Sequence, residues 1–160
     1  MARFPIISRA TIEAAMKWLW IVPTLLLAAS RPAEVAFEKV TLDLGATETC
    51  AFADINGDGR IDIVSGENWY EAPRWTPHKF REMGYERFYV DNFSDLAVDV
   101  DLDGHIDVVS CSWFAKKISW WRNPGRGRGA WKEQIVENTA PVEFVFLVDL
   151  DNDGKALEVL

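Results

Sequence analysis

The chain has 160 residues and a formal net charge of −8, with 49% hydrophobic and 26% charged residues. This composition is typical of a folded globular protein and excludes a disordered or low-complexity chain. An acidic chain lacks the basic surface that binds phosphate backbones, so we expect no nucleic-acid partner. The two cysteines, Cys50 and Cys111, are too few for a disulfide-stapled scaffold and match no zinc motif, and the sequence leaves their pairing open.

The N-terminal segment has the pattern of an export signal. An uncharged, mostly apolar run over 18–29 follows three basic residues and is too short for a membrane-spanning helix, which needs roughly 20 apolar residues. A buried N-terminal helix is the alternative, but Pro23 inside the run argues against it. We therefore expect a signal peptide over 1–30 that starts at Met1 or Met16. This predicts a secreted or periplasmic protein with no membrane span once the signal is removed.

After the signal, the chain repeats an acidic motif three times. The motif begins at Asp54, Asp99 and Asp149, so the repeat length is about 45–50 residues. An apolar segment follows each of the first two motifs (61–66 and 106–111), and then come an aromatic segment that ends in proline and a further strand-like segment. Val, Ile and aromatic residues dominate these short runs, while Gly, Pro and Asn separate them. About four strands in a repeat of this length is the size of one β-propeller blade.

We therefore predict an all-β chain made of β-propeller blades, two complete and part of a third, in an incomplete ring. A lead-in strand is expected within 31–48, carried by the strand-like segment over 35–44. The first blade is expected over 49–94, the second over 95–143, and the start of a truncated third over 144–160. Closed propellers have about 4–8 blades, so we expect the sequence to be the N-terminal piece of a longer protein or a truncated reading frame.

The acidic motifs have the spacing of a loop that binds a hard cation. Oxygen-bearing side chains occupy positions 1, 3, 5 and 9, glycine occupies position 6, where a tight turn needs positive φ, and position 7 offers its carbonyl. Calcium takes about 6–8 such oxygen ligands. Carboxylates this close together repel one another unless a cation or protons neutralise them, which argues against simple solvated turns. The expected ligands are Asp54, Asn56, Asp58 and Asp62 in the first loop, Asp99, Asp101, Asp103 and Asp107 in the second, and the carbonyls of Arg60, His105 and Lys155.

The loops differ from an EF-hand and from one another. An EF-hand is excluded because position 12 carries no glutamate and the flanking segments are strand-like. The second loop offers four carboxylates and the first offers three, so we expect the second loop to bind most tightly. In the third loop position 9 is Leu157, with Glu158 one place later, so its last ligand must come from a shifted turn or from water.

The acidic motif, the apolar strand after it and the segments WYEAP (69–73) and WWRNP (120–124) resemble FG-GAP/VCBS repeats, over about residues 49–160. The resemblance implies an integrin-α-like, calcium-binding β-propeller with Ca²⁺ as its ion. The family hosts adhesion heads, lectin-like modules and some polysaccharide-acting enzymes, so the resemblance does not fix the activity. By resemblance, the ligand role falls on Asp54, Asn56, Asp58, Asp62, Asp99, Asp101, Asp103, Asp107, Asp149, Asp151 and Asp153.

We expect an exported calcium-binding module with a binding or structural role, not an enzyme, whose partner is an unknown protein or glycan. The alternative is the N-terminal part of a propeller enzyme that acts on polysaccharides, such as a lyase. Catalysis would need basic or tyrosine side chains that converge on one face, and the sequence offers only His78 and scattered arginines. His78 aligns with Trp131 at the start of a strand, which favours a surface strand residue.

Tryptophans and a glycine-rich segment are the remaining distinctive features. Trp69, Trp120 and Trp121 lie at equivalent places in the repeats, and we expect them in the core between blades, with a sugar-stacking platform as the alternative. The RGRG segment over 126–129 could bind an anion, but a hairpin loop lengthened by glycines is the favoured interpretation.

Overall fold

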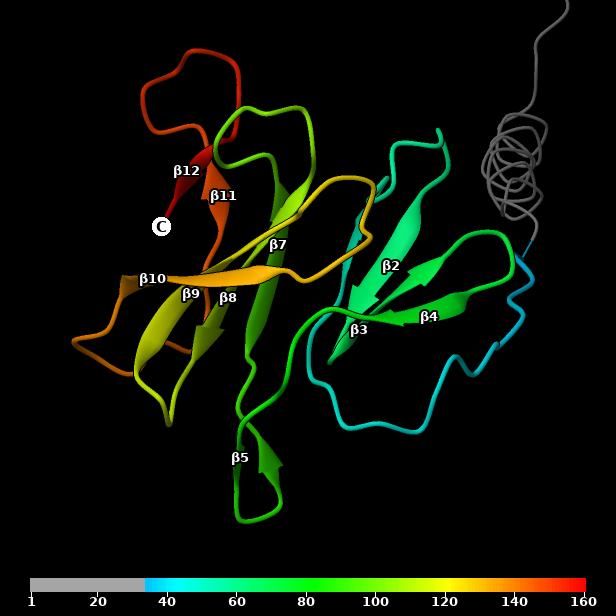
Figure 1. Ribbon diagram of the computed structural model, residues 1–160, viewed down its shortest axis with the longest axis horizontal. Helices are drawn as coiled ribbons and strands as arrows, with labels where there is room; N and C mark the ends of the chain where they lie inside the picture. The colour runs from blue at the N-terminus through cyan, green and yellow to red at the C-terminus, as the bar shows by residue number, and fades with distance from the viewer. Residues whose placement is uncertain (1–33) are drawn as a thin grey trace, which may run out of the picture. The chain divides into compact units, whose positions relative to one another are not determined.

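The computed structural model describes residues 34–160, and the predicted signal peptide over 1–30 lies outside the described residues. The chain divides into two units, Met1–Val40 and Thr41–Leu160, and all described strands lie in the second. Over 34–160 the regular secondary structure is entirely strand, in antiparallel sheets (Figure 1), which confirms the predicted all-β fold of partial propeller blades. Within the same residues we find no helix with the length and hydrophobicity to span a bilayer.

The first four-stranded sheet contains β1 (Ala51–Ala53), β2 (Asp62–Ser65), β3 (Asn68–Glu71) and β4 (Thr76–Lys79), each antiparallel to the next. Successive side chains of a strand point to opposite faces of the sheet. The fully buried Val64 in β2 marks the face that contributes to the core. The four strands follow one another in space as they do in the sequence, as expected for one blade.

The second four-stranded sheet contains β7 (Ser94–Val98), β8 (Asp107–Ser112), β9 (Lys117–Arg122) and β10 (Lys132–Glu137) and has the same strand order. Its first strand, β7, contacts β1 of the first sheet. At the other edge all six residues of β10 are exposed, and its charged side chains disfavour edge-to-edge pairing with another chain. The two sheets are therefore two blades that meet through their first strands.

Two short hairpins complete the described fold. β5 (Tyr85–Glu86) pairs with β6 (Tyr89–Val90) between the two sheets in sequence, a hairpin that the sequence pattern did not indicate. β11 (Leu147–Val148) pairs with β12 (Glu158–Val159) around the third acidic motif. The third motif thus lies between two antiparallel strands, as the first two motifs do.

The segment predicted as a lead-in strand lies before β1 and is described from residue 34 onward. Residues 34–50 contain no strand, and the run over 35–44 is largely exposed. An extended run becomes a strand only beside a hydrogen-bonding neighbour, and no described strand pairs with this one. Instead, a side chain ties the segment to the first sheet, because the Tyr70 hydroxyl donates a hydrogen bond to Asp43.

Strand register corrects the equivalence expected between His78 and Trp131. In the first sheet Trp69 pairs with His78, and in the second sheet the corresponding Trp120 pairs with Gln134. His78 therefore corresponds to Gln134, whereas Trp131 lies just before β10. The shift arises because the loop between β9 and β10 is longer than the loop between β3 and β4. His78 does lie on a strand, and its ring stacks on Trp69 with centroids 4.3 Å apart.

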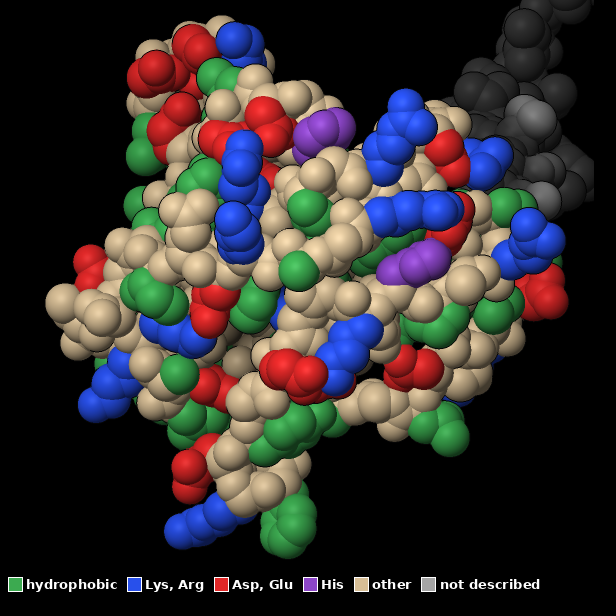
Figure 2. Space-filling view, viewed as in Figure 1, with side chains coloured by type: hydrophobic (Ala, Val, Ile, Leu, Met, Phe, Trp, Pro, Cys, Tyr) green, Lys and Arg blue, Asp and Glu red, His purple; other side chains and the backbone are tan. Residues whose placement is uncertain are grey.

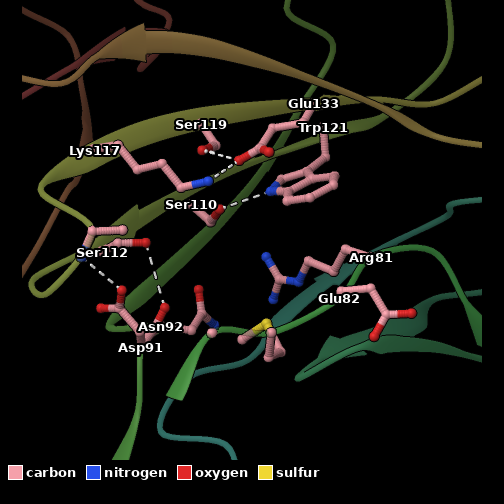
Figure 3. A pocket seen from close by; sticks show the side chains of 13 residues that line it. Arg81, Glu82, Asp91, Asn92, Ser110, Ser112, Lys117, Ser119, Trp121 and Glu133 are labelled. Atoms are coloured by element: carbon pink, nitrogen blue, oxygen red, sulfur yellow. Dashed lines mark hydrogen bonds and ion pairs between the residues drawn. The ribbon is translucent and has the colours of Figure 1, made fainter. Parts of the chain in front are cut away.

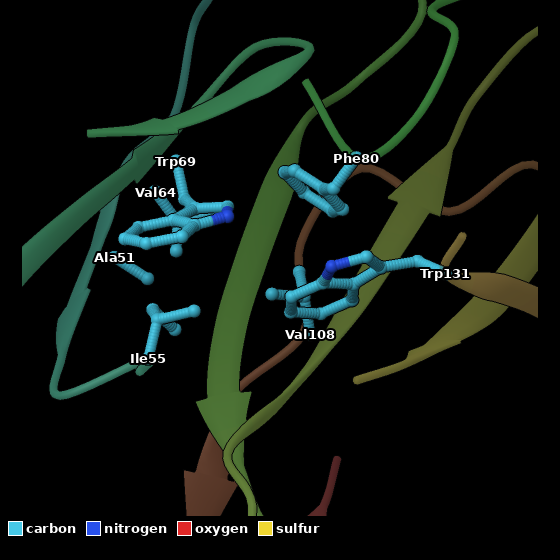
Figure 4. Packing of buried hydrophobic residues seen from close by; sticks show 7 residues of the cluster. All are labelled: Ala51, Ile55, Val64, Trp69, Phe80, Val108 and Trp131. Atoms are coloured by element: carbon cyan, nitrogen blue, oxygen red, sulfur yellow. The ribbon is translucent and has the colours of Figure 1, made fainter. Parts of the chain in front are cut away.

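A hydrophobic core lies between the two sheets (Figure 4). The Phe80 and Trp131 rings lie 4.8 Å apart, and Phe80 meets Trp121 edge-on at 6.3 Å. Trp69 is fully buried in this core and the partly buried Trp121 packs against it, as expected, whereas Trp120 is not part of the cluster. Burial of such large rings removes much apolar surface from water and is a main source of stability. The buried members are Ala51, Ile55, Val64, Trp69, Phe80, Val108 and Trp131.

The RGRG segment lies in the loop between β9 and β10, as predicted, and it also joins the two sheets. The carbonyl of Gly127 accepts hydrogen bonds from Trp69 Nε1 at 3.1 Å and from Trp131 Nε1 at 3.3 Å. Gly127 has a φ of +66°, and a Cβ atom there would lie 2.7 Å from the Trp69 ring. Both the backbone conformation and the close approach therefore require glycine at this position.

Both cysteines are free thiols. Cys50 is exposed, whereas Cys111 is buried in β8, where burial raises the pKa of its thiol to about 11. Since the thiolate is the reactive form, a buried thiol with a raised pKa is inert. Cys111 therefore serves as a small apolar core residue.

Candidate metal loops

Each acidic motif forms a loop between two consecutive antiparallel strands. The first loop (54–62) connects β1 to β2, the second (99–107) connects β7 to β8, and the third (149–158) connects β11 to β12. In Figure 1 the second and third loops project from the same end of their strands. Acidic side chains gather over that region at the upper left of Figure 2.

One hydrogen-bond pattern closes all three loops. The two oxygens of the position-1 carboxylate accept the backbone N–H groups of positions 5 and 6, at distances between 2.7 and 3.1 Å. The N–H of position 7 donates to the position-5 carboxylate at 2.8 to 3.0 Å. Glycine at position 6 has a φ between +84° and +89° in each loop, so this position needs the left-handed backbone that the sequence indicated. The position-1 residues are Asp54, Asp99 and Asp149.

The position-9 carboxylates of the first two loops are buried and hold each loop to its own blade. Asp62 accepts the N–H of Ile55 at 3.1 Å and that of Ala72 at 2.9 Å. Asp107 makes the same two bonds, to position 2 of its loop at 3.1 Å and to Asn123 at 2.8 Å. Burial raises the pKa of both carboxyl groups, and the N–H donors oppose that rise. The motif indicated a ligand role for these residues but not their connection to the segment after the third strand.

The third loop reaches the same closure with a different residue. Oε2 of Glu158 accepts the N–H of Leu150, at position 2, at 2.9 Å. Glu158 follows Leu157, which occupies position 9, and the extra methylene of glutamate lets its carboxylate reach the equivalent backbone N–H. Glu158 is therefore a loop-closing residue that the motif spacing left out.

Carboxylate oxygens converge in the second and third loops. In the second loop positions 1, 3 and 5 each offer an oxygen within 4.8 Å of the others, and in the third loop positions 1 and 3 do so together with Glu158. The first loop has asparagine at position 3 and therefore only two carboxylates at the corresponding positions. Neither Asp107 nor Asp153 belongs to these groups. The two groups are Asp99, Asp101 and Asp103, and Asp149, Asp151 and Glu158.

Arginine side chains neutralise part of this negative charge. Arg122, at the end of β9, donates to Asp101 at 2.6 Å and to Asp103 at 3.0 Å, and Arg60 pairs with Asp58 in the first loop. Both arginine side chains are about half exposed (44% and 54%), so water screens these ion pairs. The convergent groups contain only oxygen ligands, and such a donor set fits a hard cation such as Ca²⁺ rather than a soft transition metal.

A comparison with known protein families gives a match in the C-terminal part of the chain. Residues 99–159 match the family described as an FG-GAP-like repeat. The match begins at the first residue of the second loop and includes β8, β9, β10 and the third loop. The first loop lies outside the match but has the same hydrogen-bond closure. No curated protein and no solved structure shows significant similarity to the chain.

Proposed function

Since this chain carries an FG-GAP-like repeat over 99–159, as its motifs predicted, we propose that it is a calcium-stabilised β-propeller module. The family match and the all-β blades give a repeat module of the propeller type. The finer proposal is that the three acidic loops bind Ca²⁺, that the protein is exported, and that its role is recognition of a protein or glycan rather than catalysis.

The observation that carries the calcium proposal is the shared closure of the three loops. Each loop fixes its backbone with the position-1 carboxylate, and each uses a further carboxylate to hold position 2. The third loop keeps this closure with Glu158 although its spacing departs from the motif. An accidental cluster of acidic turns has no reason to preserve one geometry while the residue that provides it changes.

The chain's own residues prepare the loops for a cation. In the second loop Asp99 orients the turn through two backbone N–H groups, while Asp101 and Asp103 bring further oxygens within 4.8 Å of it. Asp107, which is fully buried, anchors the base of the loop. Bound Ca²⁺ supplies the positive charge that offsets the repulsion among these carboxylates. The loop then stiffens the connection between the first two strands of its blade.

Recognition rather than catalysis is supported by the surroundings of His78. Its imidazole stacks on Trp69 and its Nε2 lies 2.7 Å from Glu71, so the ring is held against the sheet. A general base needs hydrogen-bond reach to a substrate held beside it. His78 lines neither the cavity beside Arg81, nor the one beside Tyr70, nor the open hollow beside Phe80.

The test is thermal unfolding of the full chain, followed by tryptophan fluorescence, in calcium and in EGTA. A ligand that binds only the folded state stabilises it by about 2.7 kcal/mol per site at a hundredfold excess over Kd, which corresponds to a rise in Tm of roughly 10 °C. Magnesium should give a much smaller shift, because it dehydrates reluctantly and demands a smaller octahedral site.

Asp103→Ala should remove much of the calcium-dependent shift, since Asp103 belongs to the convergent group of the second loop. Glu86→Ala is the matched control, because Glu86 is an exposed carboxylate on β5 and lies in no acidic loop. A Tm that is the same in calcium and in EGTA would refute the calcium proposal.

A further inference from the structure

A polar cavity lies between the second sheet and the segment that follows β4 (Figure 3). Its volume is about 100 Å³, enough for several water molecules. It is lined by Ser112, which ends β8, and Lys117, which begins β9, so it lies at the end of these strands away from the acidic loop. Nearer the loop, Val108 of the same sheet is packed in the apolar core. The junction of the two blades thus changes from apolar contact at one end to a polar space at the other.

The cationic side chains of this cavity are already paired. Arg81 forms a two-pronged ion pair with Asp95, with both bonds at 2.8 Å and both side chains almost completely buried. Lys117 pairs with Glu133, which also accepts a hydrogen bond from Ser119 at 2.7 Å. Among the described residues that line the cavity, no lysine or arginine is left for an anionic ligand. The site therefore disfavours phosphate, sulfate and carboxylate groups.

Several groups that line the cavity keep unused hydrogen-bonding capacity, and three of them carry the argument. The Ser110 hydroxyl accepts a bond from Trp121 Nε1 at 3.0 Å, so its own O–H can donate. Both bonds to Glu133 go to Oε1, which leaves Oε2 as an acceptor. Asn92 is 2% exposed and uses its amide N–H for Asp95, which leaves its carbonyl oxygen as a second acceptor. One donor and two acceptors beside an indole ring match the hydroxyl groups and the apolar C–H face of a sugar.

Two exposed aromatic side chains, Tyr89 and Phe114, and the half-buried Phe93 form a patch next to the cavity, which we call the aromatic patch. Tyr89 stacks on Phe93 at 5.9 Å, and Phe114 lies 6.1 Å from each of them. Tyr89 is 49% exposed and Phe114 is 41% exposed. The patch adjoins the cavity because the N–H of Phe114 bonds to Asp91, a cavity-lining residue. Aromatic faces left open to solvent beside a polar cavity suit the stacking of further sugar rings.

We propose that the cavity and the aromatic patch together bind a neutral glycan. One sugar ring would lie against Trp121 with its hydroxyls on Ser110 and Asn92, and the next ring would stack on the aromatic patch. This inference deepens the recognition role proposed above: it names carbohydrate as the ligand and places the site at the blade end away from the calcium loops. Because the cations of the cavity are already paired with carboxylates, the site favours a neutral glycan over a sulfated or uronic one.

The test is titration calorimetry of the full chain, in calcium, with cellopentaose, xylopentaose, mannopentaose and β-1,4-galactopentaose. We expect at least one of these neutral sugars to bind. Ala115→Leu places a larger side chain at the cavity lining and should weaken that binding by about tenfold or more. Ala130→Leu is the matched control, because Ala130 is an exposed alanine in another loop of the same sheet and does not line the cavity, and it should leave the affinity unchanged.

Each remaining outcome counts against the proposal. If none of the four sugars binds a chain that calcium still stabilises, the glycan site is refuted while the calcium proposal stands. Tighter binding of uronic or sulfated oligosaccharides than of neutral ones contradicts the assigned ligand class. Binding that Ala115→Leu leaves unchanged places the sugar elsewhere. If the chain binds no sugar but binds a protein through the aromatic patch, and Phe114→Ala abolishes that binding, the ligand is a protein and the glycan proposal is wrong.

Discussion

The two blades share their strand order and loop closure but differ at the residue after the third strand. The first blade has Ala72 there and the second has Asn123, and in both the backbone N–H donates to the buried position-9 aspartate. Asn123 makes a further contact, because its amide donates to the carbonyl of Ile55, in the first acidic loop, at 3.0 Å, and to that of Ile106 at 2.9 Å. The residues that repeat therefore build each blade, whereas the residue that departs from the repeat joins the two blades.

The glycine-rich loop of the second blade also departs from the repeat and also joins the two blades. It has no counterpart of similar length in the first blade, and its Gly127 carbonyl receives a tryptophan N–H from each blade. The side-chain oxygen of Asn123 accepts the N–H groups of Gly125 and Gly127, both at 3.0 Å, and so orients this loop. Asn123 and the glycine-rich loop thus form one structure that fixes the second blade to the first.

Gly127→Ala should break this junction with the largest effect. The new Cβ would lie 2.7 Å from the Trp69 ring in a left-handed backbone conformation, so we expect a loss of unfolding free energy of roughly 3 kcal/mol. Gly57→Ala is the control, since Gly57 also has positive φ (+70°) but a Cβ atom there would meet nothing within 4 Å. It should cost about 1 kcal/mol. Equal losses in urea unfolding would show that the contact with Trp69 is unimportant.

Asn123→Ala should weaken the junction between the blades while it leaves the second blade's own acidic loop intact. It removes the two hydrogen bonds that the Asn123 side chain donates and the two that it accepts, which leaves their backbone partners without it, so we expect a loss of about 2–3 kcal/mol in urea unfolding. The backbone bond to Asp107 remains, so the second acidic loop should keep its calcium affinity. Asn138→Ala, at an exposed position, should leave the stability within about 0.5 kcal/mol of the parent chain. A neutral Asn123→Ala variant would show that the blades are joined by apolar packing alone.

Glu158→Asp should show whether side-chain length rescues the third loop. The shorter side chain would withdraw the carboxylate from Leu150 N–H and from the convergent group, so calcium affinity of this loop should fall by about tenfold. Titration with terbium, followed by the luminescence of the bound ion, measures this. Glu137→Asp, on the exposed edge strand β10, is the control and should have no effect on the ion. If Glu158→Asp leaves the terbium affinity unchanged, Glu158 does not play the part in the third loop that Asp107 plays in the second.

Arg122→Gln should give the smallest effect, and it compares the two loops that contain arginine pairs. Exposed ion pairs contribute about 0–1 kcal/mol, so unfolding in EGTA should change little. Removing a positive charge beside Asp101 and Asp103 should raise calcium affinity a few-fold at low salt, and the gain should shrink as salt screens it. Arg60→Gln, which frees one carboxylate instead of two, should give a smaller gain in the same titration.

The periodic part of the structure was accessible from the sequence. Strand-forming runs separated by glycine and proline predicted the blades, and the 1-3-5-9 spacing with glycine at position 6 predicted the acidic turns. These features are local, because each depends on residues within one strand or one loop. The segment over 35–44 contains no strand, since a strand depends on a hydrogen-bonding neighbour that local sequence does not show.

The parts that sequence reasoning missed depend on long-range contacts. Trp69 donates to the carbonyl of Gly127, which is 58 residues away in the sequence, and Asn123 donates to that of Ile55, which is 68 residues away. Both separations are longer than one repeat, so the repeat pattern does not indicate these contacts. His78 corresponds to Gln134 and not to Trp131, because the loop before the fourth strand is longer in the second blade than in the first. Glu158 was visible one place after position 9, and the signal that could have identified it is the longer side chain of glutamate at a displaced position.

The central claim is that one loop closure, built three times, binds one kind of ion. Calorimetric titration of calcium into chain freed of metal by chelation tests it most directly, because the stoichiometry and the affinity of each loop come from one experiment. We predict one Ca²⁺ per acidic loop, with tighter binding in the second loop than in the first, because the second offers four carboxylates and the first offers three. The absence of any binding heat, with a melting temperature that does not depend on calcium, would contradict the account.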